Sequence, residues 1–150
     1  MSKPLPPKAV APTTPTKTGW KDLAAPSLDD FAALADEAFK ALPQPFKRLA
    51  GDVRMVVEDF ATEEVLDQLG IEDAFELTGL YQGVNLTDRS LLDPVPQISQ
   101  VFLYRRPILD EWAERGEVTL SELVTHVLVH EIGHHFGLSD ADIHAAEDEA

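Results

Sequence analysis

The sequence predicts an α+β domain, and its pattern of strands and helices is the main reason. Three short runs have strand character, at residues 53–60, 80–87 and 98–104. About four or five segments with helical periodicity are mixed with these runs, without the regular βαβ alternation of a parallel sheet. Apolar residues make up 44% of the 150 residues, which is enough for the core of one domain.

Composition excludes several classes of protein. The chain has no cysteine, so it has neither a disulfide framework nor thiolate zinc ligands. Its formal net charge of −15 argues against binding to a nucleic-acid backbone. The first residues lack the apolar run of a signal peptide, and no stretch approaches membrane-spanning length. We therefore expect a soluble cytoplasmic protein, with no nucleic-acid or membrane partner.

The charge and the prolines are both unevenly distributed. Residues 1–26 hold six of the eleven prolines, which predicts a flexible Pro-rich tail before a domain at 27–150. From Asp110 to the end, eleven carboxylates are accompanied by one basic side chain, Arg115. This excess of acid serves solubility, or it favours neutral or basic polypeptide ligands.

Local signals set the expected element boundaries. Ser27 and Asp30 resemble a capping box before a helix that reaches Leu42. A short turn of helix is expected at 46–50. Thr62 is expected to cap a helix that buries Val65, Leu66 and Leu69 and ends at Gly70, and a further helix is expected between Arg105 and Gly116. The helix that carries the histidines should bury an apolar stripe (Leu120, Leu123, Val124, Val127 and Leu128), and Ser139 with Asp142 is a possible cap of a terminal helix.

The most informative stretch is His130-Glu131-Ile132-Gly133-His134-His135-Phe136-Gly137-Leu138-Ser139-Asp140, with the pattern H-E-x-x-H-x-x-G-x-x-D. Residues four apart share one helix face, so the imidazoles of His130 and His134 can converge on one ion. The side chain of Glu131 is rotated by about 100° around the helix axis from that of His130, which suits a general base better than a ligand. Gly137 can adopt the left-handed conformation that ends a helix, after which the chain can offer Asp140 as a third zinc ligand.

Alternatives exist for the neighbouring residues. His144 lies four residues after Asp140 on a predicted terminal helix, so it is a rival third ligand or an oxyanion stabiliser. His126, one turn before His130, is a packed or half-exposed histidine, or it contacts one of the metal ligands. His135 is expected at the surface. Arg105 and Arg106 are expected to pair with acids rather than with a substrate carboxylate.

Three segments together resemble one family. Gly79–Ser90 (GLYQGVNLTDRS), Val101–Leu109 (VFLYRRPIL) and the histidine motif are similar to the small bacterial zincin-like metallopeptidases, which are minimal single-domain zincins. The resemblance covers roughly residues 50–145. It implies a zincin-like fold, in which a short mixed β-sheet packs on an active-site helix that carries HExxH.

The resemblance also implies a function. By position, His130, His134 and Asp140 would hold Zn²⁺, and Glu131 would assist attack of a zinc-bound water on a peptide bond of a peptide or protein substrate. In larger zincins an edge strand pairs with the substrate, and residues 80–87 are the candidate here, through Tyr81, Gly83 and Asn85.

Departures from related motifs keep a second hypothesis open. The only methionines are Met1 and Met55, so the methionine turn of metzincins is absent. No tyrosine follows Tyr104, which leaves His144, Tyr104 or Tyr81 to steady an oxyanion. The alternative function is a zinc-binding regulatory or interaction module with weak or lost peptidase activity. A third hypothesis is a metal hydrolase that acts on something other than peptides. Related histidine-rich motifs occur in small endoribonucleases, but the net charge of −15 argues against an RNA substrate.

Overall fold

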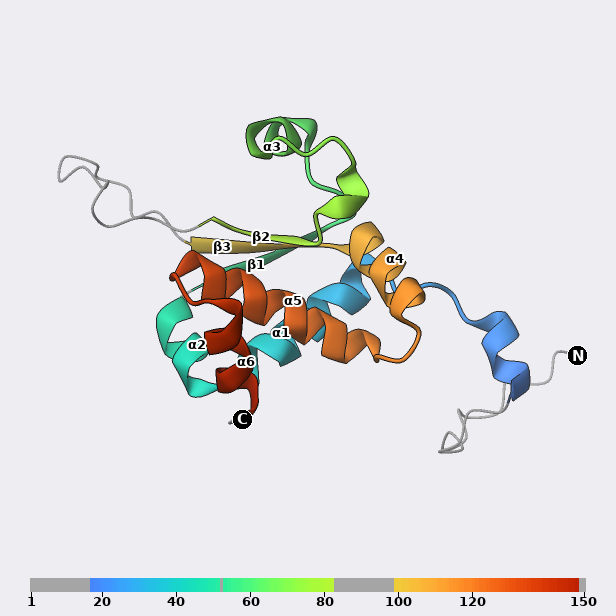
Figure 1. Cartoon of the computed structure of the whole chain (residues 1–150). Helices are drawn as coiled ribbons and strands as arrows, with labels where there is room; N and C mark the ends of the chain where they lie inside the picture. Colours follow the sequence, from blue (N-terminus) through green and yellow to red (C-terminus); the bar gives the residue numbers. More distant parts are fainter. Residues whose placement is uncertain (1–16, 52, 83–98, 149–150) are drawn as a thin grey trace, which may run out of the picture.

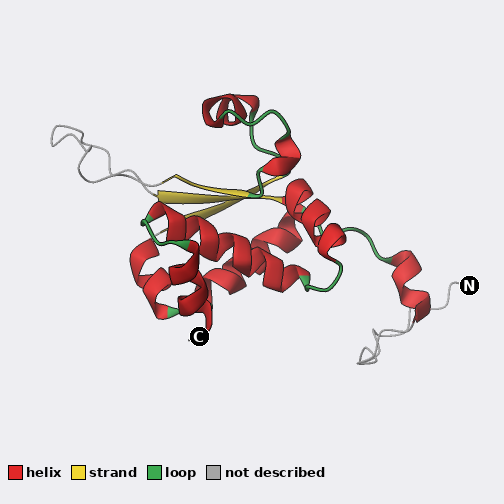
Figure 2. Cartoon of the chain, in the orientation of Figure 1, coloured by secondary structure: helices red, strands yellow, loops and turns green. Residues whose placement is uncertain are grey.

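The structure is a computed structural model that describes residues 17–51, 53–82 and 99–148 (Figure 1). Helices make up most of it, and the strands are few and short (Figure 2). The elements in chain order are η1 (Lys17–Asp22), α1 (Leu28–Lys40), α2 (Gln44–Ala50), β1 (Val53–Glu58), α3 (Glu63–Leu69), η2 (Ala74–Glu76), β2 (Gly79–Gln82), β3 (Ser99–Tyr104), α4 (Arg105–Arg115), α5 (Leu120–His135) and α6 (Asp140–Asp148).

The three strands form one mixed sheet in the order β1-β3-β2. β1 runs parallel to β3, with Val57 opposite Leu103. β2 runs antiparallel to β3, with Tyr81 opposite Val101. This small mixed sheet confirms the α+β class, and it leaves β2 at one edge of the sheet.

Alternate side chains of β3 point to opposite faces of the sheet, and the core is therefore divided into two clusters. Val101 and Leu103 are fully buried in the larger cluster, which α1, α2, α5 and α6 complete on one face of the sheet (Figure 1). Tyr104 is buried in the smaller cluster with Leu66 of α3, and Phe102 packs against it on the opposite face. The sheet is therefore covered on both faces, with α3 and η2 above it in Figure 1.

The predicted caps are present at the helix starts. Ser27 and Asp30 form a reciprocal capping box at α1, and the Thr62 side chain caps α3. Gly70 and Gly116 follow α3 and α4 in the left-handed conformation, as the sequence predicted.

Three local expectations need correction. Leu69 was expected on the buried stripe of α3, but it is 47% exposed because this short helix covers the sheet mainly through Leu66. The run predicted as a strand at 53–60 ends at Glu58, and Asp59 instead pairs with Arg105 (2.6 Å). The short helix expected at 46–50 begins at Gln44.

The start of the described chain is less closely packed than the rest. Residues Lys17–Asp22 form a 3-10 helix that the sequence did not predict. Trp20 and Leu23 are 64% and 76% exposed, so they do not dock on the domain. Arg105 also donates a hydrogen bond to the carbonyl of Pro26 (3.0 Å), just before the start of α1. Within the described ranges, no helix is long and apolar enough to cross a membrane.

Candidate active site

Helix α5 carries the histidine motif and lies at the centre of the molecule. It packs against α1, α2, α4 and α6 and against strands β2 and β3. Thr119 caps its start by accepting a hydrogen bond from the Glu122 N–H (3.1 Å). Its predicted apolar stripe is buried, since Leu123, Val124 and Leu128 are at most 2% exposed. Such a helix holds its C-terminal side chains rigidly.

The end of α5 is a hydrogen-bonded reversal. Gly137 has a φ of +82°, as its place in the motif predicted. The Gly137 N–H donates to the carbonyl of His134 (3.0 Å), and the Leu138 N–H donates to that of Gly133 (2.9 Å). These two bonds are those of a Schellman motif. Ser139 then starts α6 by a reciprocal capping box with Asp142, which was also predicted.

Gly133, inside the motif, allows α6 to approach α5 closely. A Cβ atom at Gly133 would lie 2.7 Å from both Cδ1 and Cγ1 of Ile143, and 3.3 Å from Cε1 of Phe46. Both of these neighbours are fully buried. The sequence did not predict this requirement, because a glycine within a helix does not indicate which distant residue packs against it.

The separation of the two motif histidines is close to that of two imidazoles bound to one ion. The ring centroids of His130 and His134 are 5.5 Å apart. Two imidazoles bound tetrahedrally to one zinc, with Zn–N of about 2.0–2.1 Å, place their centroids about 5 Å apart. The ring of His126 lies 4.1 Å from that of His130, so His126 belongs to the same group of imidazoles. These residues fit a zinc ion in chemical type and in separation.

The structure leaves the third ligand open between the two candidates. His144 of α6 is exposed, and its ring lies 5.9 Å from that of His130 at an interplanar angle of 78°. Asp140 is the first residue of α6, but its side chain lies outside the described part of the structure. Among the side chains that are described, no three of His, Cys, Asp or Glu form a group that could hold a metal ion.

Glu131 occupies a different environment from the histidines. It faces β2, where a Cβ atom at Gly79 would lie 3.2 Å from Cγ of Glu131 and 2.8 Å from Cγ1 of Val127. Burial raises the pKa of Glu131 to about 7, although a hydrogen bond from the backbone N–H of Tyr81 opposes this effect. A carboxyl group with this pKa can both accept and return a proton near neutral pH.

Strand β2, the candidate substrate strand, also contacts the motif through a side chain. Tyr81 is 7% exposed, and its ring stacks on His135 with centroids 4.0 Å apart. His135 is exposed, as expected, and partial desolvation lowers its pKa. Gly83 and Asn85, the other predicted positions on this strand, lie outside the described residues.

Tyr104 is poorly placed to reach a substrate. It is 2% exposed in the smaller cluster. Burial, with the negative charges of Glu58 and Glu131, raises its pKa to about 12. Of the other oxyanion candidates, His144 alone is exposed, since Tyr81 is covered as well.

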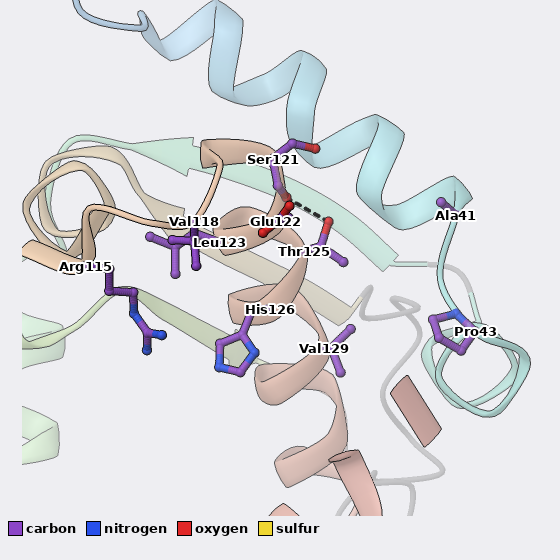
Figure 3. A pocket seen from close by; sticks show the side chains of 10 residues that line it. All are labelled: Ala41, Pro43, Arg115, Val118, Ser121, Glu122, Leu123, Thr125, His126 and Val129. Atoms are coloured by element: carbon purple, nitrogen blue, oxygen red, sulfur yellow. Dashed lines mark hydrogen bonds between the residues drawn. The ribbon is translucent and has the colours of Figure 1, made fainter. Parts of the chain in front are cut away.

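A groove of about 470 Å³ lies along α5 between Ser121 and Val129, and His126 is among the residues that line it. Ala41 and Pro43 lie on one side of α5, and Arg115 and Val118 lie on the other (Figure 3). The groove therefore reaches the group of imidazoles from the side opposite the end of the motif helix.

Comparison with known protein families gives this geometry a context. Residues 50–150 match the family described as zincin-like metallopeptidase. The chain belongs to this family. The match confirms the resemblance found in the sequence, and it includes the whole histidine motif of this zincin-like metallopeptidase. A search of curated proteins found no match.

Proposed function

We propose that this zincin-like metallopeptidase hydrolyses peptide bonds with the help of a zinc ion. The observation that carries the proposal is the Glu131 carboxyl group, which follows His130 in the motif, is half-buried against β2 and has a pKa raised to about 7. A purely structural metal site has no need of such a carboxyl group. The family membership supports the same conclusion.

Each residue has a separate role in the proposed reaction. His130 and His134 hold the ion, and Asp140 is the proposed third ligand, with His144 as its rival. Zinc supplies a Lewis acid for the scissile carbonyl and lowers the pKa of water at the site. Glu131 takes the proton from the attacking water and passes it to the leaving nitrogen. Desolvation of Glu131 makes it a strong enough base for the first transfer and an acid for the second.

Replacing Glu131 by glutamine tests the proposal most directly. We expect Glu131→Gln to keep about one zinc per chain and to lose peptide cleavage by at least about 10²-fold, because the proton carrier is gone. Elemental analysis gives the zinc content, and a mixed peptide library followed by mass spectrometry gives the cleavage. Glu122→Gln, which removes an exposed carboxylate from the same helix, is the matched control. Full cleavage by the Glu131 variant would refute the assigned mechanism.

The third ligand is tested by zinc content alone. We expect Asp140→Ala to lose zinc or to bind it at least tenfold more weakly, and His144→Ala to retain it. Competition with a chromogenic chelator measures both affinities without any need for a substrate. The reverse result would assign His144 as the ligand and leave Asp140 as the start of α6.

A second candidate function is a zinc-binding regulatory or interaction module with weak or lost peptidase activity. The observation that favours it is the hydrogen bond from the Tyr81 backbone, which already engages the Glu131 carboxylate. A module of this kind binds zinc and cleaves no library peptide, and its Glu131→Gln variant behaves as the wild type does. The same assays therefore separate the two functions.

A further inference from the structure

Three aromatic side chains meet where β2 crosses the end of α5. Tyr81 stacks on His135 with centroids 4.0 Å apart and planes tilted by 30°. Phe136 meets Tyr81 edge-on at 5.7 Å and His135 edge-on at 5.1 Å. We refer to Tyr81, His135 and Phe136 as the aromatic cluster. Its members come from two elements, so the cluster exists only in the folded chain.

The aromatic cluster adjoins the proposed proton carrier. His135 lies one turn after Glu131 on the same face of α5. Tyr81 carries the backbone N–H that binds the Glu131 carboxylate. A peptide whose scissile bond lies at Glu131 therefore has a neighbouring side chain within reach of these rings.

The cluster has a covered base and an open rim. Tyr81 is 7% exposed and forms the base, while His135 and Phe136 are exposed, Phe136 by 40%. An exposed aromatic side chain beside a buried one presents apolar surface that a ligand can cover. Packing of α5 on β2 accounts for the burial of Tyr81, but it does not require Phe136 to stay open to solvent.

We propose that the aromatic cluster is the subsite that selects a large apolar or aromatic side chain of the peptide substrate. This inference rests on the proposed peptidase function, and it specifies the class of substrate. His135 and Phe136 contact the substrate side chain, and Tyr81 supports them from below. The eleven carboxylates after residue 109, accompanied by Arg115 alone, favour neutral or lysine-bearing residues around that side chain.

Quenched fluorescent decapeptides with lysine-bearing flanks provide the test. The peptides differ at one position, which carries Phe, Leu, Ala or Glu. For the zinc-loaded full-length protein, we expect kcat/KM for the Phe or Leu peptide to exceed that for the Ala peptide by at least about tenfold. Phe136→Ala is expected to reduce this ratio several-fold, and Phe136→Leu, which keeps an apolar side chain, is expected to retain most of it.

Phe75→Ala is the matched control for these variants. Phe75 is 41% exposed, close to the exposure of Phe136, and it packs edge-on against Phe60 (5.0 Å) rather than near α5. We expect Phe75→Ala to leave the ratio of the Phe peptide to the Ala peptide unchanged. Thermal unfolding of every variant identifies any that lose the fold, and Phe136→Leu keeps the test valid if Phe136→Ala is one of them.

Binding of the same peptides to Glu131→Gln separates this inference from the proposed function. Binding that prefers the Phe peptide without any cleavage by the wild type would support the aromatic subsite and refute the peptidase function. Cleavage without preference among the peptides, or an unchanged ratio in Phe136→Ala, would overturn the subsite and leave the peptidase function standing. Equal binding of all the peptides without cleavage would overturn both.

Discussion

Strand β2 and helix α6 approach the motif helix α5 equally closely, but by different means. We refer to the side of α5 that contacts β2 as the β2 flank and to the side that contacts α6 as the α6 flank. On the β2 flank the glycine belongs to the strand, and Gly79 lets the main chain pass over Val127 and Glu131. On the α6 flank the glycine belongs to the motif itself, and Gly133 receives the side chain of Ile143.

The difference shows how the two halves of the proposed chemistry are kept apart. The β2 flank contacts the base, through the backbone N–H of Tyr81 on Glu131. The α6 flank carries both candidates for the third ligand, Asp140 and His144. A substitution that disturbs the β2 flank should therefore affect proton transfer, and one that disturbs the α6 flank should affect metal binding.

Breaking the α6 flank has the largest expected effect on stability. Gly133→Ala places a methyl group 2.7 Å from two atoms of buried Ile143. Overpacking of this kind costs about 1–3 kcal/mol, and we expect the upper end because Phe46 closes the other side. The better helix propensity of alanine offsets about 1 kcal/mol of this cost. Urea unfolding of the metal-free protein measures the net effect, and chelator competition should show weaker zinc binding.

Ile143→Val provides the control for Gly133→Ala. It removes the Cδ1 atom that the new methyl group would meet, so the double variant should recover part of the lost stability and of the zinc affinity. If the costs of the two single changes simply add, the close contact between α5 and α6 is not what Gly133 provides.

The buried charge on the β2 flank predicts a pH dependence of intermediate size. The pKa of Glu131 is raised from 4.5 to about 7 in the folded protein, so the folded state binds this proton more tightly than the unfolded state. Its contribution to stability is complete below pH 4.5 and is lost as the pH rises through about 7. Metal-free Glu131→Gln lacks this loss, and we expect it to be more stable than the wild type at pH 8 by on the order of 2 kcal/mol.

Urea unfolding of both metal-free proteins between pH 4 and pH 8 measures this difference. The gain of Glu131→Gln over the wild type should increase with pH across that range. A gain that stays constant with pH would show that Glu131 is not buried as a charged group. Glu122→Gln, at an exposed position on the same helix, is the matched control.

Breaking the β2 flank by Gly79→Ala has the smallest expected effect on stability, about 1–2 kcal/mol. The new methyl group meets Cγ1 of Val127 at 2.8 Å and the carbonyl oxygen of Phe102 at 3.1 Å. The buried, β-branched Val127 has little freedom to move, but β2 is a short strand at the edge of the sheet and can shift in part. Zinc affinity should stay within about twofold of the wild type, because the histidines lie on another face of α5. Peptide cleavage should fall more than zinc affinity does. Equal losses of both would show that the two flanks are not separate.

The sequence predicted the features that depend on neighbouring residues along the chain. The capping boxes at Ser27 and Ser139 and the left-handed Gly137 need only a few residues of context. The burial of α5 followed from its apolar periodicity. The family resemblance predicted a mixed sheet packed on the motif helix. The parallel pairing of β1 with β3, the antiparallel pairing of β2 with β3 and the packing of α5 on β2 and β3 agree with it.

Features that depend on distant segments could not be predicted in this way. Gly79 and Val127 are far apart in the sequence, and so are Gly133 and Phe46. The hydrogen bond from Tyr81 to Glu131 uses a main-chain group, which leaves no signal in the residue type. Leu69 was misplaced because periodicity gives the apolar face of a helix but not the extent of what covers it.

The reversal at Gly137 connects the proposed metal site to the start of α6. His134 is a proposed ligand through its imidazole, and its carbonyl closes the reversal by accepting the hydrogen bond from the Gly137 N–H (3.0 Å). An ion that binds this imidazole more tightly when the reversal is closed stabilises the closed reversal by the same free energy. For such an ion, occupancy of the proposed site and order at the start of α6 would rise and fall together.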